Sequence, residues 1–376
     1  MSNEAPQIRF KGFTDAWEQR KLGEVCIVTM GQSPDGKNYT DNPNDHILVQ
    51  GNADMKDGKV HPRVWTTQVT KIARAGDIIL SVRAPVGDVG KTDYDIVLGR
   101  GVAGINGNEF VYQILLAMKE NAFWVKLSTG STFESINSIH IKDSLINVPA
   151  SEEQIAIGNF FHTLDNLITL HKRKLDSLKQ LKMGYLQNMF PQTEENEPKV
   201  RFSRLTEPWE VKKIGEVVES EIKGKAKAEM IGFESIYLDA RYLNGGERFY
   251  VNALTDVEAE DVLILWDGSQ AGTVYHGFTG ALGSTLKAYK PKYSGSFLYQ
   301  QLKKNQQKIY DSYRTPNIPH VVKTFTDEFE INLPTIEEQQ KIGNFFRILD
   351  EQITIQKTKL DKLKQIKTAY LQKMFV

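Results

Sequence analysis

Two long segments that repeat each other decide the architecture of this chain. Residues 149–190 read PASEEQIAIGNFFHTLDNLITLHKRKLDSLKQLKMGYLQNMF, and residues 334–375 read PTIEEQQKIGNFFRILDEQITIQKTKLDKLKQIKTAYLQKMF. At a constant offset of 185, without a gap, they are identical at 26 of 42 positions. A shorter pair opens each copy: residues 9–25 and 201–217 are identical at 9 of 17 positions, at an offset of 192. The chain is therefore an internal duplication with similar ends and dissimilar middles.

Apolar residues in both repeated segments recur at alternating steps of four and three, which is the a/d seam of a heptad repeat. The seam positions are Leu164, Ile168, Leu175, Leu178 and Tyr185, then Leu349, Ile353, Leu360, Leu363 and Tyr370. Polar residues interrupt the seam at equivalent places, His171 and Lys182 in the first copy and Gln356 and Lys367 in the second. Such positions commonly fix register or orientation. We predict two helices of roughly 60 Å that pack on each other; an ordinary helix-bundle core is the alternative, and the pattern leaves parallel and antiparallel pairing open.

A helix-start signal follows a proline in both copies. Ser151 with Gln154, and Thr335 with Glu338, have the spacing of a capping box, in which each side chain bonds the backbone N–H of the other residue. These boundaries predict five parts. They are a globular domain at 1–150, a long helix at 151–190, a polar linker at 191–200, a second globular domain at 201–335 and a second long helix at 336–376.

The two globular middles have a mixed α/β pattern. Apolar, β-branched stretches at 47–53, 77–86 and 261–268 are bounded by turn residues and indicate strands. Residues 110–123 and 297–313 have helical periodicity.

Composition limits the function classes. The 376 residues carry 47 Lys+Arg and 47 Asp+Glu, so the chain is not a broadly basic nucleic-acid binder. Local basic clusters remain candidates for DNA contact: Lys223, Lys225 and Lys227, and Arg83, Lys91 and Arg100. The single cysteine, Cys26, cannot form an internal disulfide. No apolar run approaches membrane-spanning length and the N-terminus lacks a signal-peptide pattern, so we expect a soluble, cytoplasmic protein with no membrane partner.

Catalytic motifs are weak. Gly99-x-Gly101-x-x-Gly104 matches a dinucleotide fingerprint but is followed by INGNEF, which cannot continue the helix that such a site requires. Asp35, Asp54 and Lys56 fit only the permissive carboxylate–carboxylate–lysine pattern of Mg²⁺-dependent nucleases. The seven histidines show no metal-ligand spacing. We expect no catalytic residue and no metal site on this chain.

The duplicated arrangement resembles the specificity (S) subunit of type I restriction–modification systems. The resemblance covers essentially the whole chain and rests on three features. They are the twice-used P-x-x-E-E-Q before a helix ending in YLQNMF or YLQKMF, the W-E-x-x-K-[LI]-G-E-V openings at Trp17–Val25 and Trp209–Val217, and the GDIIL strand at 76–80.

The resemblance implies an α+β fold with two α/β target-recognition domains, each reading half of a bipartite DNA sequence, and a pseudo-two-fold internal duplication. It also implies that the two long coiled-coil helices pack antiparallel and set the unread gap. The implied partners are double-stranded DNA, two modification subunits and two restriction subunits. S-adenosylmethionine, ATP and Mg²⁺ are expected on those subunits, and no cofactor on this chain.

Four segments resemble the recognition loops of that family. They are GQSPDGKNY at 31–39, SVRAPVGDVG at 81–90 with WDGSQAG at 266–272 in the second copy, and STGSTFESIN at 128–137. The counterpart of the last, SYRTPNIPHV at 312–321, keeps Asn317-Ile318 but lacks Gly-Ser-Thr. Their polar side chains suit base or phosphate contacts. Besides the basic clusters, the candidates are Gln32, Ser33, Lys37, Asn38, Tyr39, Ser131, Thr132, Asn137, Ser269, Gln270, Arg314 and Asn317.

The leading hypothesis is a non-catalytic DNA-specificity subunit. A two-headed protein-interaction scaffold without nucleic-acid function is the alternative from another class, and a stand-alone nuclease based on Asp35, Asp54 and Lys56 is the third.

Overall fold

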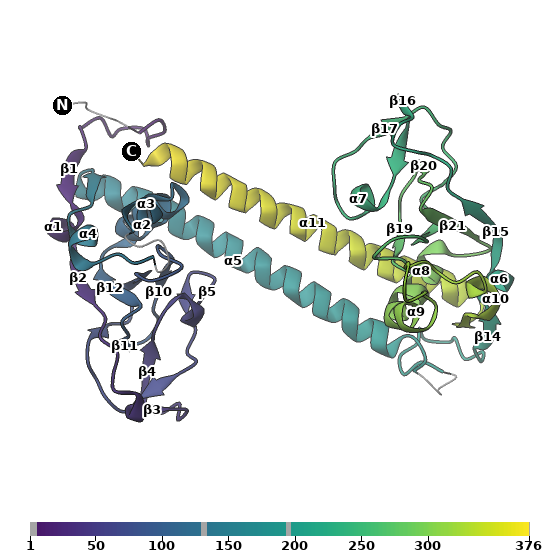
Figure 1. Ribbon diagram of the computed structural model, residues 1–376, viewed down its shortest axis with the longest axis horizontal. Helices are drawn as coiled ribbons and strands as arrows, with labels where there is room; N and C mark the ends of the chain where they lie inside the picture. Colours follow the sequence, from purple (N-terminus) through teal and green to yellow (C-terminus); the bar gives the residue numbers. More distant parts are fainter. Residues whose placement is uncertain (1–5, 129–133, 193–196, 376) are drawn as a thin grey trace. The chain divides into compact units, whose positions relative to one another are not determined.

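The computed structural model describes residues 6–128, 134–192 and 197–375. The chain divides into two compact units, the first formed by Met1–His171 with Lys359–Val376 and the second by Lys172–Thr358. Each unit therefore combines a globular part with segments of both long helices, α5 (Ser151–Asn188) and α11 (Ile336–Met374) (Figure 1).

Unit 1 is built on a six-stranded sheet of order β2-β12-β9-β10-β6-β5, a five-stranded sheet of order β3-β7-β4-β11-β8, and the pair β1-β13. Its strands are β1 (Glu18–Lys21), β2 (Ile27–Met30), β3 (Tyr39–Thr40), β4 (His46–Val49), β5 (Met55–Lys56), β6 (Lys59–Val60), β7 (Trp65–Thr66), β8 (Ile72–Ala73), β9 (Ile78–Ser81), β10 (Val89–Lys91), β11 (Ile96–Leu98), β12 (Val102–Asn106) and β13 (Leu145–Val148). Its short helices are α1 (Leu22–Val25), α2 (Glu109–Glu120), α3 (Phe123–Leu127) and α4 (Ser138–Lys142).

Unit 2 has a four-stranded sheet of order β15-β21-β18-β19, a three-stranded sheet of order β17-β16-β20, and the pair β14-β22. Its strands are β14 (Glu210–Lys213), β15 (Val218–Lys223), β16 (Ile231–Leu238), β17 (Tyr250–Val251), β18 (Val262–Leu265), β19 (Val274–His276), β20 (Ala281–Leu282), β21 (Leu286–Pro291) and β22 (Glu330–Leu333). Its short helices are α6 (Ile214–Val217), α7 (Ala240–Leu243), α8 (Gly295–Lys304), α9 (Gln306–Ser312) and α10 (Phe325–Glu328).

The two units share one plan. The strand order β2-β12-β9-β10 recurs as β15-β21-β18-β19, and β1-β13 recurs as β14-β22. The predicted strands at 77–86 and 261–268 form β9 and β18, whose residues are all buried because both lie inside their sheets. The predicted helix at 297–313 is two helices, since α8 ends before Asn305 and α9 follows it.

Within each unit the two long helices run antiparallel. In unit 1 the first turns of α5 pack on the last turns of α11, with the Phe160 and Tyr370 ring centroids 5.0 Å apart. In unit 2 the last turns of α5 pack on the first turns of α11, with Tyr185 and Phe345 4.8 Å apart. The expected α+β fold with paired antiparallel helices is confirmed. All ten apolar seam positions are buried or half-buried.

Two of the polar seam residues form equivalent three-element nodes. In unit 2 the Lys182 Nζ of α5 pairs with Asp350 of α11 at 2.6 Å, and Gln300 of α8 donates to the other carboxylate oxygen at 2.9 Å. In unit 1, Lys367 of α11 pairs with Asp165 of α5 at 2.6 Å, and Gln113 of α2 donates to it at 3.0 Å. Each node ties both long helices to the globular part of its unit, and this provides the register control that polar seam positions commonly supply.

The capping box forms only in part. The Thr335 hydroxyl accepts from the Glu338 N–H at 3.3 Å, as expected. The Glu338 carboxylate does not return to Thr335, because Arg201 takes both of its oxygens. In unit 1 the Gln154 side chain donates to the Pro149 carbonyl instead of completing a box with Ser151. The predicted box is therefore wrong in the first copy. In the second copy Glu338 anchors the opening segment through Arg201, and in the first copy Glu153 does so through Arg9.

Across the described residues, no helix combines the length and apolarity required to cross a bilayer.

Candidate nucleic-acid interface

Four chain segments meet beyond the ends of the central strands in each unit, and we call this arrangement the loop frame. In unit 1 it comprises residues 31–33, 82–83, 98–102 and 135–136, and in unit 2 residues 224–226, 266–267, 282–286 and 320–321. Three of the four segments in unit 1 belong to the loops in which the sequence placed recognition residues.

A backbone crossing between glycines closes the frame in both units. A Cβ atom on Gly31 would lie 2.0 Å from the carbonyl oxygen of Gly99, and one on Gly224 would lie 1.9 Å from that of Gly283. Any side chain would collide with the opposite backbone, so both crossings require glycine.

The same backbone hydrogen bonds recur in the two frames. In unit 1, Gly31 N donates to Val102 O, Gln32 N to Leu98 O, Val82 N to Gly101 O, and Ile136 N to Val82 O, at 2.8–3.0 Å. In unit 2, Gly224 N donates to Leu286 O, Lys225 N to Leu282 O, Trp266 N to Thr285 O, and Val321 N to Trp266 O, also at 2.8–3.0 Å. Isolated bridges pair Arg83 with Ser135 and Asp267 with His320. The two copies therefore hold one rigid backbone arrangement.

The structure brings several predicted site residues together on this frame. In unit 1 these are Gln32, Ser33, Arg83 and Arg100, and the Ser33 hydroxyl accepts from the Arg100 N–H at 3.0 Å. In unit 2, Lys225 lies in the frame. The exposed Ser269 and Gln270 lie in the loop that continues from the frame segment 266–267. Arg314 joins that loop by donating to the Ser269 carbonyl at 3.3 Å. Lys223 and Lys227 are exposed beside the frame, and Asn317 is exposed in the turn before His320.

Other predicted residues lie beside the unit 1 frame or have structural partners. Gln68 accepts from the Asn38 side chain at 2.8 Å, which fixes the turn that carries Lys37 and Tyr39. The Asn137 side chain caps α4 by accepting from His140 N at 2.9 Å. Ser131 and Thr132 lie outside the described residues.

Lys91 does not belong to the frame. Its ammonium pairs with Glu109 at the start of α2 and lies 4.6 Å from the centre of the Tyr112 ring. Burial raises the pKa of the Tyr112 hydroxyl, so this ring stays neutral beneath the cation. Lys91 therefore links β10 to α2 within the core of unit 1.

The residues of the weak catalytic patterns have structural roles. The Asp54 carboxylate is buried and accepts from Gln50 N at 2.7 Å, whereas Asp35 accepts from Lys37 N in an exposed turn. In the part of the chain that the structure describes, no three His, Cys, Asp or Glu side chains gather as metal ligands would. The Gly99-x-Gly101-x-x-Gly104 motif joins β11 to β12, so a strand follows it where a dinucleotide site needs a helix.

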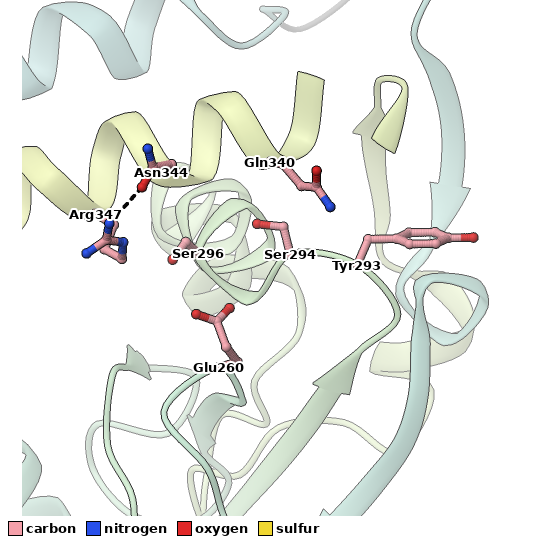
Figure 2. Close-up of a pocket in the computed structure, with 7 residues that line it drawn as sticks. All are labelled: Glu260, Tyr293, Ser294, Ser296, Gln340, Asn344 and Arg347. Carbon is pink, nitrogen blue, oxygen red and sulfur yellow. Dashed lines mark hydrogen bonds between the residues drawn. The ribbon is translucent and has the colours of Figure 1, made fainter. Parts of the chain in front are cut away.

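A small polar cavity of about 200 Å³ lies between α8 and α11 in unit 2 (Figure 2). Its lining residues are Glu260, Tyr293, Ser294, Ser296, Gln340, Asn344 and Arg347. Arg347, the cation of this cavity, donates to Asn344 at 2.7 Å and pairs with Glu351. The cavity is smaller than typical small-molecule sites of about 300–1,000 Å³, and its cation already has partners.

Sequence reasoning missed several residues that the frame presents. Asp267, Ser284 and His320 occupy the positions of Arg83, Arg100 and Ser135. A signal was present in the repeated Leu-Gly pair, LGRGV at 98–102 and LGSTL at 282–286. The buried ion pairs Arg9–Glu153 and Arg201–Glu338 were also missed, although all four residues are identical between the copies.

Two equivalent frames that carry different polar side chains define a duplicated recognition protein. Residues 14–180 and 206–365 match the family described as Type I restriction modification DNA specificity domain. The chain belongs to this family and contains two copies of its domain.

Two similar proteins come from Methanocaldococcus jannaschii. The type I restriction enzyme MjaVIII specificity subunit is 31% identical over 193 residues, which are 48% of this chain and 45% of that protein. The putative type I restriction enzyme MjaX specificity subunit is 30% identical over 174 residues, which are 44% of this chain and 40% of that protein. The matched part spans less than half the length of these relatives.

Solved structures with the same fold extend over nearly the full chain. The S subunit of a type I restriction–modification system from M. genitalium superposes with a TM-score of 0.77 at 18% identity, covering 99% of both chains. A chain from a structural study of complex assembly and conformational transition of the type I R-M system gives a TM-score of 0.50 at 18% identity, covering 97% of this chain and 99% of that one.

Proposed function

We propose that this chain is the DNA-specificity subunit of a type I restriction–modification complex and reads a bipartite duplex target. The loop frame of unit 1 contacts one half of the target, and the loop frame of unit 2 contacts the other half. The recurrence of one backbone frame with different exposed side chains carries this proposal, because two readers of different sequences need the same scaffold and different contacts.

The chemistry of the frames suits a duplex. Arg83, Arg100 and Lys225 supply donors for phosphates or for guanine edges, while Gln32 offers both a donor and an acceptor. The net charge of zero limits what the chain can hold alone, since phosphate contacts dominate affinity for DNA. Partner subunits would supply the remaining cationic surface.

The chain itself performs no chemistry in this proposal. Two modification subunits carry the S-adenosylmethionine-dependent adenine methyltransferase, and two restriction subunits carry the ATP- and Mg²⁺-dependent translocase and nuclease. The complex works in the cytoplasm, where chromosomal DNA lies.

A domain exchange tests the proposal. Replacing residues 1–150 by those of a relative with another specificity should change one half of the methylated sequence and leave the other half unchanged. The methylome of cells that express the chain with its modification subunits measures this. A change in both halves, or in neither, contradicts the assignment of one half-site to each unit.

Binding measurements separate this proposal from a protein scaffold. The complex with modification subunits should bind its target duplex with an affinity that falls steeply as salt rises, and the isolated chain should bind weakly. Failure of the complex to bind any duplex would favour the scaffold.

A further inference from the structure

Three pairs of exposed side chains occupy equivalent positions on the two loop frames. Each pair is defined by the shared backbone hydrogen bonds and bridges and not by sequence similarity. The pairs are Gln32 and Lys225, Arg83 and Asp267, and Arg100 and Ser284. All three pairs differ in chemistry, whereas the glycines that close the crossing are the same in both copies.

These six side chains are available for a ligand. Among the residues that the structure describes, none of the six side chains forms a hydrogen bond or a salt bridge, and Lys225 acts on the Asp256 carboxylate only electrostatically. Some charged side chains on or beside the neighbouring sheets do have partners: Lys287 pairs with Glu221 at 2.5 Å, and Arg74 pairs with Asp95 at 2.6 Å. The frames therefore hold polar groups in fixed backbone positions without satisfying them internally.

We infer that these equivalent positions are the DNA-contacting positions of the two units, and that Asp267 is the main acceptor with which unit 2 reads its half-site. The inference rests on the proposed function and specifies which residues distinguish the two half-sites.

Asp267 is the most informative of the six because it cannot serve a phosphate. An exposed carboxylate facing a duplex is repelled by the backbone unless it meets a donor. The donors of the major groove are the exocyclic amino groups, N4 of cytosine and N6 of adenine. With the frame facing the duplex, as the proposed function has it, Asp267 fits a base edge, and Lys225 of the same frame can hold a phosphate.

Unit 1 presents the opposite chemistry at the equivalent position. Arg83 and Arg100 carry only donors, which match the O6 and N7 acceptors of guanine or a phosphate oxygen. A cation in one frame and an anion in the other predict half-sites with different base preferences, although the backbone that holds them is shared.

The test uses the full chain, expressed with its modification subunits in a host without other adenine methylation. Asp267→Ala and the isosteric Asp267→Asn should relax one base pair of the half-site read by unit 2 and lower methylation of the original sequence by about 5- to 100-fold. Arg83→Ala should affect only the other half-site. Glu219→Ala, at an exposed carboxylate of unit 2 outside the frame, serves as the matched control and should change nothing.

The outcomes separate this inference from the proposed function. A relaxed base pair in one half-site supports the inference. An unchanged motif in both Asp267 variants, with normal methylation, overturns base reading by Asp267 and leaves the proposed function standing. A uniform loss at all sequences also overturns it, because the contact would then be insensitive to sequence. If the unchanged complex methylates no bipartite sequence, the proposed function itself fails.

Discussion

Breaking the buried ion pair between Arg201 and Glu338 by removing one partner should be one of the most destabilising single changes in unit 2. The Glu338 side chain is fully buried and that of Arg201 is 13% exposed. The Arg201 Nε and a terminal nitrogen donate to the two carboxylate oxygens at 3.0 and 2.7 Å, and the same terminal nitrogen donates to the Glu207 carbonyl at 2.7 Å. These bonds hold the segment that leads into β14 against the first turn of α11.

Replacing Arg201 by methionine leaves a buried carboxylate without its cation. Loss of one partner from a buried pair costs about 3–5 kcal/mol. Unit 2 spans Lys172–Thr358, which is 187 residues, and at this size about 1 kcal/mol lowers the unfolding temperature by roughly 2–4 °C. Scanning calorimetry should therefore show the transition of unit 2 lowered by roughly 6–20 °C.

Two further variants make this prediction specific. Glu351→Ala removes the exposed pair with Arg347 on the same helix, and such a pair contributes about 0.3–0.5 kcal/mol. The double variant Arg201→Met with Glu338→Leu removes both charges and should recover most of the loss, because an apolar pair of similar volume is tolerated at buried sites. If Arg201→Met shifted the transition no more than Glu351→Ala does, the reasoning would be refuted.

Three other perturbations have expected outcomes. Burial lowers the pKa of His276, so as pH falls the imidazole is protonated in the unfolded chain before it is protonated in the folded chain. The free energy of unfolding should therefore fall as pH drops below about 6.5. His276→Phe should remove this dependence of the unfolding free energy on pH, measured by urea titrations at pH 7.5 and 5.5. Asp350→Ala leaves the ammonium of Lys182 and the buried amide of Gln300 without their acceptor and should cost about 1–3 kcal/mol in the same titrations. A seven-residue insertion after Lys174 lengthens α5 by about 10.5 Å and alone should destabilise the chain. Adding a matched insertion after Lys359 in α11 should restore stability. The methylome should then show the unread gap between the two half-sites widened by up to about 3 base pairs.

The duplication and the helix pair could be predicted from sequence because their signals are periodic or repeated. Heptad spacing predicted the seam, and the seam residues Tyr370 and Tyr185 contact Phe160 and Phe345 across the helix pair. The direction of pairing did not follow from the spacing, since a heptad seam is compatible with both directions. It came from the family resemblance.

The loop frame could be predicted only in part. The loops at 31–39 and 81–90 were identified in unit 1, and 266–272 was identified as the unit 2 counterpart of 81–90. Asp267 was not singled out within that segment, because an isolated aspartate carries no local signal. Its equivalence to Arg83 becomes evident when Trp266 N is seen to donate to Thr285 O in the way that Val82 N donates to Gly101 O. Long-range backbone pairing of this kind leaves no periodic trace in the sequence.

The two nodes account for the contrast between similar ends and dissimilar middles. Asp165 and Lys182 are 17 residues apart on α5, and Asp350 and Lys367 are 17 residues apart on α11. Each helix supplies the aspartate of one node and the lysine of the other. The two helices must therefore keep the same number of residues between their aspartate and their lysine. An insertion or deletion in one copy requires the same change in the other. In the part of the chain that the structure describes, the backbone hydrogen bonds of each loop frame stay within its own copy. Their exposed side chains are free to diverge as long as the glycine crossings remain, which is the condition under which one duplicated scaffold can acquire two specificities.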